Sequence, residues 1–358
     1  MRGICLGIYI YNKEIIGLEE SLTELKLLSE TIEIEVVDTI VFRLKEINPA
    51  TLITSFMIEE LKTIIEKHKI EVIIFNDELK PNQQRNLEKE TGIMVIDRTE
   101  LILRIFENNA RTAEAKTQVE IAKLKYMLPR LKRMWTHLSR IEGGYGFTKG
   151  PGEKQIEIDK RLIKRRISKL TEKLKEIESN RNIIRQKRLT ENIPIVSIIG
   201  YTNAGKTALL NTLSKAQLLS ENRLFSTLSP VIRKVFINGK IVLFADTVGF
   251  INKLPTQLIA SFKSTLEEIK YSRLLLILQD SSSSKIKDKL NTVFSTLDEI
   301  GCSNKKYILC FSKIDMIDRE SLKSLMDEYP LAIPISSLTG KGIDKLKKRI
   351  FNELFKET

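Results

Sequence analysis

Short apolar runs alternate with helical patterns over the first hundred residues. Runs rich in β-branched residues predict strands, and apolar residues every three or four positions predict helices. Such alternation is typical of a parallel sheet covered by helices, so residues 1–111 are predicted to form a small N-terminal α/β domain. The expected strands are Ile4–Ile10, Ile34–Val41, Val72–Phe75 and Met94–Asp97, and the expected helices are Leu18–Ser29, Thr51–Lys67, Pro81–Glu90 and Thr99–Asn108. No catalytic constellation is apparent in this domain.

The pattern becomes purely helical from Thr112. Helical spacing predicts one long helix over Thr112–Ser139 and a second over Lys154–Leu189. Between them, Glu142–Glu153 holds five glycines and one proline, which cannot continue a helix. Residues 112–192 are therefore predicted to form an antiparallel two-helix coiled-coil hairpin with a glycine-rich tip. The apolar face of its second helix would consist of Ile156, Leu162, Ile163, Ile167, Leu170, Leu174 and Ile177.

Strands and helices alternate again over residues 193–358. Asn238-Gly239 is a strong two-residue hairpin turn, so one antiparallel strand pair is expected in an otherwise parallel sheet. The expected strands are Ile193–Ile199, Val231–Ile237, Lys240–Ala245, Leu274–Gln279, Lys306–Phe311 and Leu331–Ile335. The expected helices are Lys206–Leu213, Pro255–Lys270, Ile286–Ile300, Ser321–Asp327 and Ile343–Phe355. The overall expectation is a three-part α/β protein ending in a Ras-like domain.

A phosphate-binding motif joins the first strand and helix of this third region. It reads G-x-x-x-x-G-K-T and consists of Gly200, Tyr201, Thr202, Asn203, Ala204, Gly205, Lys206 and Thr207. In such a P-loop the backbone amides cradle phosphates, the lysine reaches the β- and γ-phosphates, and the hydroxyl binds Mg²⁺. A chance match in a glycine-containing loop is the alternative, and the strand before it and helix after it speak against that.

Two further segments match the parts that sense a γ-phosphate. Asp246-Thr247-Val248-Gly249 follows a strand, which places a carboxylate near Mg²⁺ and the Gly249 N–H near the γ-phosphate. Within Phe225–Pro230, Thr227 is the candidate that closes on Mg²⁺ as a switch. The expected metal ligands are Thr207, Thr227 and Asp246, and the expected catalytic groups are Lys206, Thr227 and Gly249. Phe250 stands where many relatives carry a water-orienting glutamine, so slow unassisted hydrolysis is expected.

Base recognition is predicted from two later strand ends. Ser312-Lys313-Ile314-Asp315 is a variant of Asn-Lys-x-Asp, in which a buried Asp315 carboxylate would accept hydrogen bonds from guanine. Lys313 would lie along the ring, and a backbone N–H of Ser336, Ser337 or Leu338 would donate to guanine O6. The usual asparagine is Ser312 here, and the usual alanine is Ser337. We expect the first change to remove an amide that braces the base loop, with guanine preference kept and affinity weakened.

The net charge of +13 is concentrated in the middle of the chain. Residues 1–111 carry 14 Lys and Arg against 20 Asp and Glu, residues 112–192 carry 21 against 10, and residues 193–358 carry 24 against 16. A local excess of this kind indicates a polyanion-binding element, with a salt-bridged solvated face as the alternative. The candidate RNA contacts are Tyr145, Phe147 and Lys149 at the tip, and Lys160, Arg161, Lys164, Arg165 and Arg166 on the second helix.

Cysteine and histidine content excludes several classes of site. The three cysteines have neither metal spacing nor a disulfide pattern, and the two histidines are too few for a histidine-based site. A membrane span of ~18 apolar residues is lacking. The apolar start at Ile4–Ile10 is interpreted as a strand rather than a signal peptide. A reduced, cytoplasmic setting is expected.

Together these residues resemble the HflX-type GTPases of the Obg–HflX group. The most specific matching segments are Asp97–Phe106, Ala113–Tyr126, Pro129–Leu131, Gly150–Glu153 with Gln155, Glu157 and Asp159, and Asp246–Ile251 with Leu254 and Pro255. The resemblance implies a cytosolic, monomeric enzyme that hydrolyses GTP with Mg²⁺ and binds the large ribosomal subunit. Its basic hairpin would reach ribosomal RNA near the peptidyl-transferase region, and some members separate the subunits of stalled ribosomes.

The chain departs from the family pattern in two places. Ile53–Phe56 replaces a glycine-rich stretch, so any role of that loop is not expected here. Many bacterial members also carry an extra C-terminal domain, whose contacts we expect to be missing. Two other functions stay open from the sequence: a GTP-dependent signalling switch whose hairpin docks a protein target, and a P-loop ATPase that acts on RNA.

Overall fold

The computed structural model describes residues 1–11, 17–131, 153–190, 192–214, 225, 231–251 and 268–356. The chain divides into two compact units. Unit 1 comprises Met1–Asn108 with Thr117–Leu174, and unit 2 comprises Asn109–Lys116 with Lys175–Thr358. In the part of the chain that is described, no helix is both long and apolar enough to cross a bilayer.

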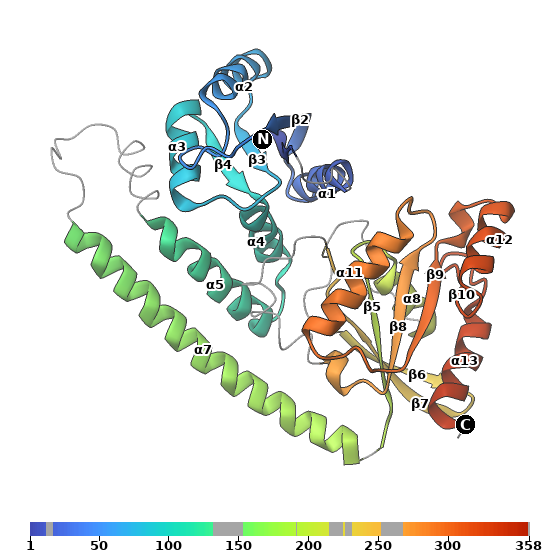
Figure 1. Ribbon diagram of the computed structural model, residues 1–358. Coiled ribbons are helices and arrows are strands. Elements are labelled where there is room, and N and C mark those ends of the chain that lie inside the picture. The colour runs from blue at the N-terminus through green and yellow to red at the C-terminus, as the bar shows by residue number, and fades with distance from the viewer. Residues whose placement is uncertain are drawn as a thin grey trace. The chain divides into compact units, whose positions relative to one another are not determined.

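Unit 1 contains a four-stranded, all-parallel sheet with the strand order β2-β1-β3-β4. The strands are β1 (Arg2–Ile10), β2 (Glu35–Leu44), β3 (Val72–Phe75) and β4 (Met94–Asp97), and the helices are α1 (Leu18–Thr31), α2 (Ser55–His68), α3 (Pro81–Thr91) and α4 (Arg98–Asn109) (Figure 1). The predicted small α/β domain is confirmed. Helix α2 begins four residues later than expected, because the Thr54 side chain accepts the Met57 N–H and so caps the helix there.

The helical region begins with α5 (Ala113–Met127) and contains the 38-residue helix α7 (Glu153–Thr190). The expected continuous helix over 112–139 is wrong in one respect. A 3₁₀ turn, Leu128–Arg130, follows α5, since Pro129 lacks the N–H that an α-helix needs. Within unit 1 the two helices run side by side, and Arg166 forms an ion pair with Glu120 at 2.8 Å (Figure 1). Leu162 is 54% exposed and so does not belong to the apolar face of α7.

Unit 2 contains a six-stranded sheet with the order β10-β9-β8-β5-β7-β6. The strands are β5 (Ile195–Gly200), β6 (Val231–Ile237), β7 (Lys240–Asp246), β8 (Leu274–Asp280), β9 (Tyr307–Ser312) and β10 (Ile333–Pro334), and the helices are α8 (Lys206–Ser214), α11 (Ile286–Glu299), α12 (Arg319–Glu328) and α13 (Ile343–Phe355). Among the described strands of this sheet, β6 and β7 are the one antiparallel pair, as the Asn238-Gly239 turn predicts. Most of the expected helix Pro255–Lys270 lies outside the described residues.

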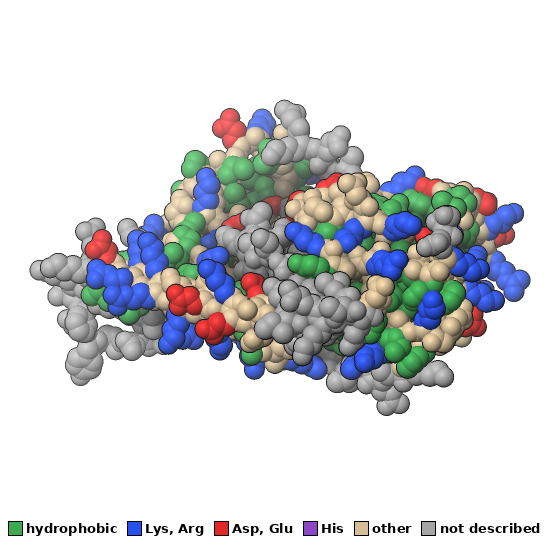
Figure 2. All heavy atoms as spheres, turned by 90° about the horizontal axis from the view of Figure 1, so that it is seen from below, with side chains coloured by type: hydrophobic (Ala, Val, Ile, Leu, Met, Phe, Trp, Pro, Cys, Tyr) green, Lys and Arg blue, Asp and Glu red, His purple; other side chains and the backbone are tan. Residues whose placement is uncertain are grey.

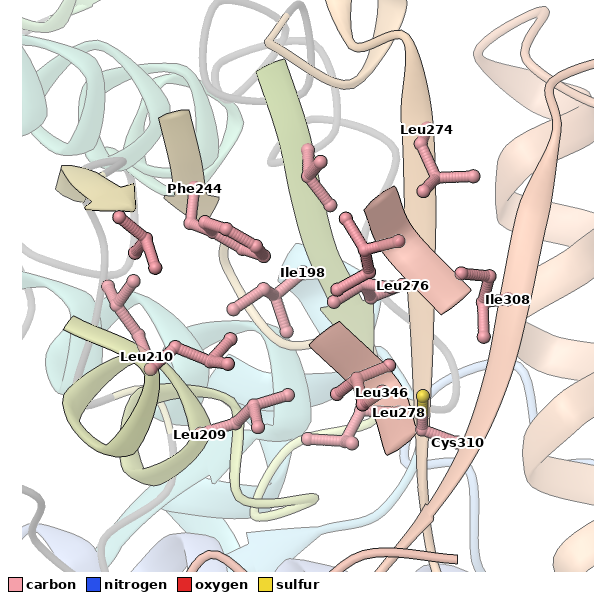
Figure 3. Close-up of a cluster of buried hydrophobic side chains, with 14 of the residues drawn as sticks. Ile198, Leu209, Leu210, Phe244, Leu274, Leu276, Leu278, Ile308, Cys310 and Leu346 are labelled. Atoms are coloured by element: carbon pink, nitrogen blue, oxygen red, sulfur yellow. The ribbon is translucent and has the colours of Figure 1, made fainter. Parts of the chain in front are cut away.

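The hydrophobic core of this second sheet holds the strands in place, and with them the edge that their carboxyl ends form. Ile198, Leu276, Leu278 and Phe244 are fully buried and pack with Leu209, Leu210 of α8 and Leu346 of α13 (Figure 3). The strand β5 is buried along its whole length. Because β5, β7, β8 and β9 are parallel, their carboxyl ends lie at one edge, where ligands bind in open α/β sheets.

Candidate nucleotide-binding site

The P-loop connects the carboxyl end of β5 to the start of α8. At Gly200, a Cβ atom would lie 2.2 Å from the backbone oxygen of Leu278, so only glycine lets β5 leave the sheet beside β8. Asn203 and Gly205 have φ values of 60° and 86°. Left-handed residues of this kind, set beside helical ones, form the concave backbone that binds anions. The backbone therefore has the form that the motif predicts.

Lys206 is held over this loop by backbone oxygens. Its Nζ donates to the carbonyls of Gly200 at 3.2 Å and Tyr201 at 2.8 Å, and the residue is 8% exposed. Burial lowers the pKa of Lys206 to about 8, although the nearby Asp246 carboxylate acts in the opposite direction. A buried cation bonded to neutral carbonyls is stabilised further by an anion, so the site favours a phosphate.

Asp246 and Thr207 come together from different elements. Asp246 ends β7 with no exposed surface, and the Thr207 hydroxyl donates to its carboxylate at 2.8 Å. Hard oxygen donors of this kind suit Mg²⁺, which commonly takes one or two protein ligands and completes its shell with phosphates and waters. Among the described residues there is no cluster of three or more His, Cys, Asp and Glu that could hold a metal ion.

The segment after Asp246 lies directly against the P-loop. A Cβ atom on Gly249 would lie 2.8 Å from Lys206 Nζ and 2.9 Å from Thr202 Cα, so the close approach requires glycine. Thr202 N–H donates to the Phe250 oxygen at 2.8 Å, and Phe250 N–H donates to the Gly200 oxygen at 3.1 Å. The Phe250 side chain is 3% exposed and packs in an apolar cluster of the core. Thr227 lies outside the described residues.

The base loop is braced by Ser312, contrary to the expectation that serine would lose this function. At the end of β9, its hydroxyl donates to the P-loop oxygen of Ala204 at 2.8 Å, with the Gln279 oxygen a second acceptor at 3.2 Å. A shorter side chain than asparagine thus still ties the base loop to the P-loop.

Sequence reasoning also missed Asp280 and Ser281 at the end of β8. Lys313 Nζ lies 2.7 Å from the Asp280 carboxylate, and the Ser281 N–H and hydroxyl both donate to the Ser312 oxygen. Burial acts to raise the pKa of Asp280, but hydrogen bonds from Lys313 and Ser282 outweigh it, so the pKa lies below its ordinary value. Their position directly after a buried parallel strand was the signal that could have identified them.

Asp315 departs from the prediction, because its carboxylate is exposed rather than buried. It lies in a 3₁₀ turn after β9, on the solvent side of Ile314, which is the residue that is buried there. A base stacked along Lys313 would itself have to cover Asp315. The neighbouring loop is ordered by Ser336, whose hydroxyl accepts the Thr339 N–H, and by Thr212, whose hydroxyl donates to the Ser337 oxygen at 3.0 Å.

The structure brings most of the predicted nucleotide residues to one edge and leaves the predicted RNA contacts elsewhere. The contacts described above link the P-loop with Asp246, Gly249, Ser312 and Lys313. Leu338, in contrast, is 86% exposed. Five candidate RNA contacts are exposed on α7, namely Lys160, Arg161, Lys164, Arg165 and Arg166. Tyr145, Phe147 and Lys149 lie outside the described residues.

Three family models match successive parts of the chain. A GTP-binding GTPase N-terminal model matches residues 19–107, and a GTP-binding GTPase middle-region model matches residues 109–188. A model described as a 50S ribosome-binding GTPase matches residues 195–313. The three matches follow one another with little gap.

Curated relatives match along nearly the whole chain. A GTPase HflX from Caldanaerobacter subterraneus subsp. tengcongensis is 44% identical over 95% of this chain and 78% of its own length. The Escherichia coli GTPase HflX is 38% identical over 94% of this chain and 79% of its own length. A GTP-binding protein from Sulfolobus solfataricus, solved with GDP, is 28% identical with a TM-score of 0.50 and 99% coverage of both chains.

Proposed function

Because this chain belongs to the HflX family of GTPases, we propose that it uses GTP to control binding to the large ribosomal subunit and its RNA. The family model described as a 50S ribosome-binding GTPase supports the choice of subunit. The observation that carries the proposal is the exposed basic surface of α7. The enzyme would act in the cytoplasm, where ribosomes are.

Helix α7 presents a group of cations to solvent along its described part. Lys160, Arg161, Lys164 and Arg165 are exposed, and Arg166 is the member of this group that pairs with Glu120. Figure 2 shows the molecule from the side of α7, with Lys and Arg side chains gathered along the helix. Cations on a rigid helix bind backbone phosphates and release counterions. A salt-bridged helix face is the alternative. Its cations would pair with carboxylates, as Arg166 does with Glu120.

Each residue of the nucleotide site is proposed to have one role in binding GTP. Lys206 and the P-loop amides hold the β- and γ-phosphates, and Thr207, Asp246 and Thr227 would hold Mg²⁺, which would neutralise phosphate charge. Gly249 offers its N–H to the γ-phosphate from beside Lys206. Asp315, Lys313 and the Ser336–Leu338 backbone select guanine, and Ser312 keeps that loop in register with the P-loop.

Slow hydrolysis in isolation is part of the proposal. The Phe250 side chain is buried in the core, so it cannot reach a water beside the γ-phosphate. The ribosome is then the source of the ordering or the group that activates hydrolysis. Multiple-turnover rates with and without large subunits test this point, and equal rates would contradict it.

Co-sedimentation with isolated large subunits tests the main proposal. We expect the full chain to pellet with them in a non-hydrolysable GTP analogue and to stay in the supernatant in GDP. The double variant Lys164→Glu, Arg165→Glu should lose binding, because it reverses two exposed cations of α7. Lys345→Glu, Lys348→Glu is the matched control on α13, where both lysines are also exposed. Equal binding by both variants would refute RNA contact through α7.

We extend the proposal to separation of ribosomal subunits. A 38-residue helix is roughly 57 Å long, enough to reach deep into a subunit interface. Light scattering of joined ribosomes should fall on adding the protein with the GTP analogue. If the protein binds large subunits while scattering stays constant, it binds without splitting.

A further inference from the structure

Asp280 lies at the end of β8, and both of its carboxylate oxygens have partners. Oδ2 lies 2.7 Å from Lys313 Nζ, and Oδ1 accepts the N–H and the hydroxyl of Ser282 at 2.9 and 2.7 Å. Asp280 is also the register partner of Ser312, in the last residue pair that β8 and β9 form. The carboxylate is therefore held by its own strand end and turn, so it can hold the ammonium group that it binds.

Lys313 has a backbone conformation that needs support from its surroundings. Its φ and ψ are 57° and 34°, in the left-handed region that few residues other than glycine adopt. Residues persist in such a conformation where the surrounding structure fixes them. The side chain of Lys313 is 25% exposed and that of Asp280 is 20% exposed, so water screens the ion pair only in part. The pair thus determines where the Lys313 ammonium lies.

The ion pair orders the side chain of Lys313 before any ligand is present. A lysine has a flexible four-carbon stem, which loses rotamer freedom when a ligand covers it. Here the ammonium is already bound to Asp280, so the stem follows a fixed path from the base loop to the end of β8. Ordering that precedes binding does not reduce the affinity of the ligand, which is the effect of preorganisation. A methylene stem also carries no hydrogen-bonding group that distinguishes one purine from another.

We propose that Asp280 is a positioning residue for nucleotide binding, which holds the Lys313 stem where a purine ring lies against it. The inference rests on the proposed function, in which Lys313 contributes to binding of the base. It refines that function by dividing the base-binding group. The Lys313 stem, held by Asp280, adds affinity for any purine nucleotide, whereas Asp315 and the Ser336–Leu338 backbone distinguish guanine.

A double-mutant cycle with GDP tests whether Asp280 acts through Lys313. Asp280→Asn keeps an acceptor for Ser282 but removes the ion pair, so the dissociation constant of GDP should rise about 3- to 10-fold, the effect of ordering one long side chain. Lys313→Met retains a stem without the ammonium and should have a similar effect. In the Lys313→Met background, Asp280→Asn should change the affinity less than about 2-fold. Effects that multiply would show that Asp280 acts independently of Lys313 and would overturn the proposal.

Two further ligands separate positioning from other roles of Asp280. Inosine diphosphate lacks the exocyclic amine of guanine, and Asp280→Asn should weaken it by the same factor as GDP. Pyrophosphate has no base, and its affinity, measured by competition, should not change. A changed ratio of GDP to inosine diphosphate affinity would mean that Asp280 reads the base itself, and weaker pyrophosphate binding would mean that it only maintains the structure of the site. Either result contradicts the proposal.

Asp288→Asn is the matched control, because it removes an exposed carboxylate in the first turn of α11. It should leave the affinities for all three ligands unchanged. These measurements include no ribosomes, so a failed cycle leaves the ribosome proposal standing, and a failed co-sedimentation leaves this proposal standing. A chain that binds no GDP would overturn both.

Discussion

The two parallel sheets of this chain place charged residues at the same kind of edge but use them differently. At the carboxyl edge of the first sheet stand Asn76, Asp97 and Arg98, after β3 and β4. At the carboxyl edge of the second stand Lys206 and Asp246, after β5 and β7. Both groups are buried. Of these two edges, the second has the form of a ligand site.

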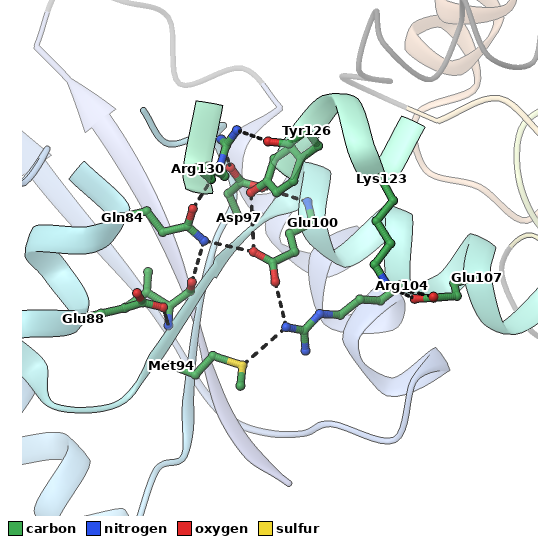
Figure 4. A network of polar contacts seen from close by, with 11 residues as sticks. Gln84, Glu88, Met94, Asp97, Glu100, Arg104, Glu107, Lys123, Tyr126 and Arg130 are labelled. Carbon is green, nitrogen blue, oxygen red and sulfur yellow. Dashed lines mark hydrogen bonds and ion pairs between the residues drawn. The ribbon is translucent and has the colours of Figure 1, made fainter. Parts of the chain in front are cut away.

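At the first edge the charged groups bind one another. Arg98 donates to the Ser21 and Asn76 oxygens and forms an ion pair with Glu24. Asp97 accepts from the Leu79 and Glu100 N–H groups, the Tyr126 hydroxyl and Arg130. Figure 4 shows how Gln84, Glu100 and Arg104 continue this network from α3 and α4 to α5 and the turn after it. Such a network stabilises the N-terminal domain and fixes α5 to it.

At the second edge the backbone, more than the side chains, makes the difference. Lys206 contacts two backbone oxygens, and its loop contains residues at positive φ. Gly249 approaches within a distance that no Cβ would allow. Polar residues at a sheet edge therefore do not define a nucleotide site, whereas a concave loop with a buried cation does.

Arg98→Leu should give the largest effect. It would leave Glu24 buried without its cation, so unfolding of the N-terminal domain should cost about 3–5 kcal/mol less. GDP affinity of the folded protein should not change. Urea denaturation and GDP titration measure the two quantities. Arg104→Leu is the control, because that side chain is 35% exposed and its pair with Glu100 should contribute under about 1 kcal/mol. Loss of GDP affinity in Arg98→Leu would break the contrast between the edges.

Lys206→Ala should have effects opposite to those of Arg98→Leu, because it should change GDP affinity and not lower the unfolding free energy. Loss of the charge-assisted contact with the β-phosphate should weaken GDP binding about 100-fold, or ~2.7 kcal/mol. The unfolding free energy should stay level or rise, because a buried ammonium is costly to desolvate. Calorimetric titration and denaturation test this pair of outcomes, with the exposed Lys287→Ala as the control. Marked destabilisation without loss of affinity would make Lys206 structural.

Ser312→Ala should have a smaller effect. It removes one hydroxyl that joins the base loop to the P-loop, so GDP affinity should fall about 5-fold, or ~1 kcal/mol. Ser312→Asn, the usual residue of the motif, should retain the affinity. An alanine variant that binds as well as the parent would show that Ser281 and Asp280 brace the loop without it.

Much of both sheets could be predicted because their strands are short, apolar and separated by clear turn signals. The P-loop and Asp246 were also predictable, since their chemistry depends on fixed local spacing. Asp280 was not, because it acts through Lys313, which lies 33 residues away in the chain. The exposure of Asp315 was missed because periodicity does not determine which side of a 3₁₀ turn faces solvent. Pro129 marks the end of α5, although apolar residues at helical spacing continue on both sides of it.

Two cysteines offer separate reporters of the two sheets. Cys5 lies in β1 and Cys310 in β9, both fully buried, and burial raises the pKa of each thiol from 9.0 to about 12. At pH 8 the folded thiols therefore hold about 1,000-fold less reactive thiolate than unfolded ones. Alkylation must then proceed through opening of the sheet around each cysteine.

Site-resolved alkylation at pH 8, with and without GDP at 100 times its dissociation constant, tests the central claim most directly. A ligand at that concentration stabilises the sheet that holds it by about 2.7 kcal/mol. Peptide mapping by mass spectrometry should show Cys310 labelled about 100-fold more slowly in GDP and Cys5 labelled at an unchanged rate. Slower labelling at Cys5 with no change at Cys310 would place the nucleotide on the first sheet and contradict the account.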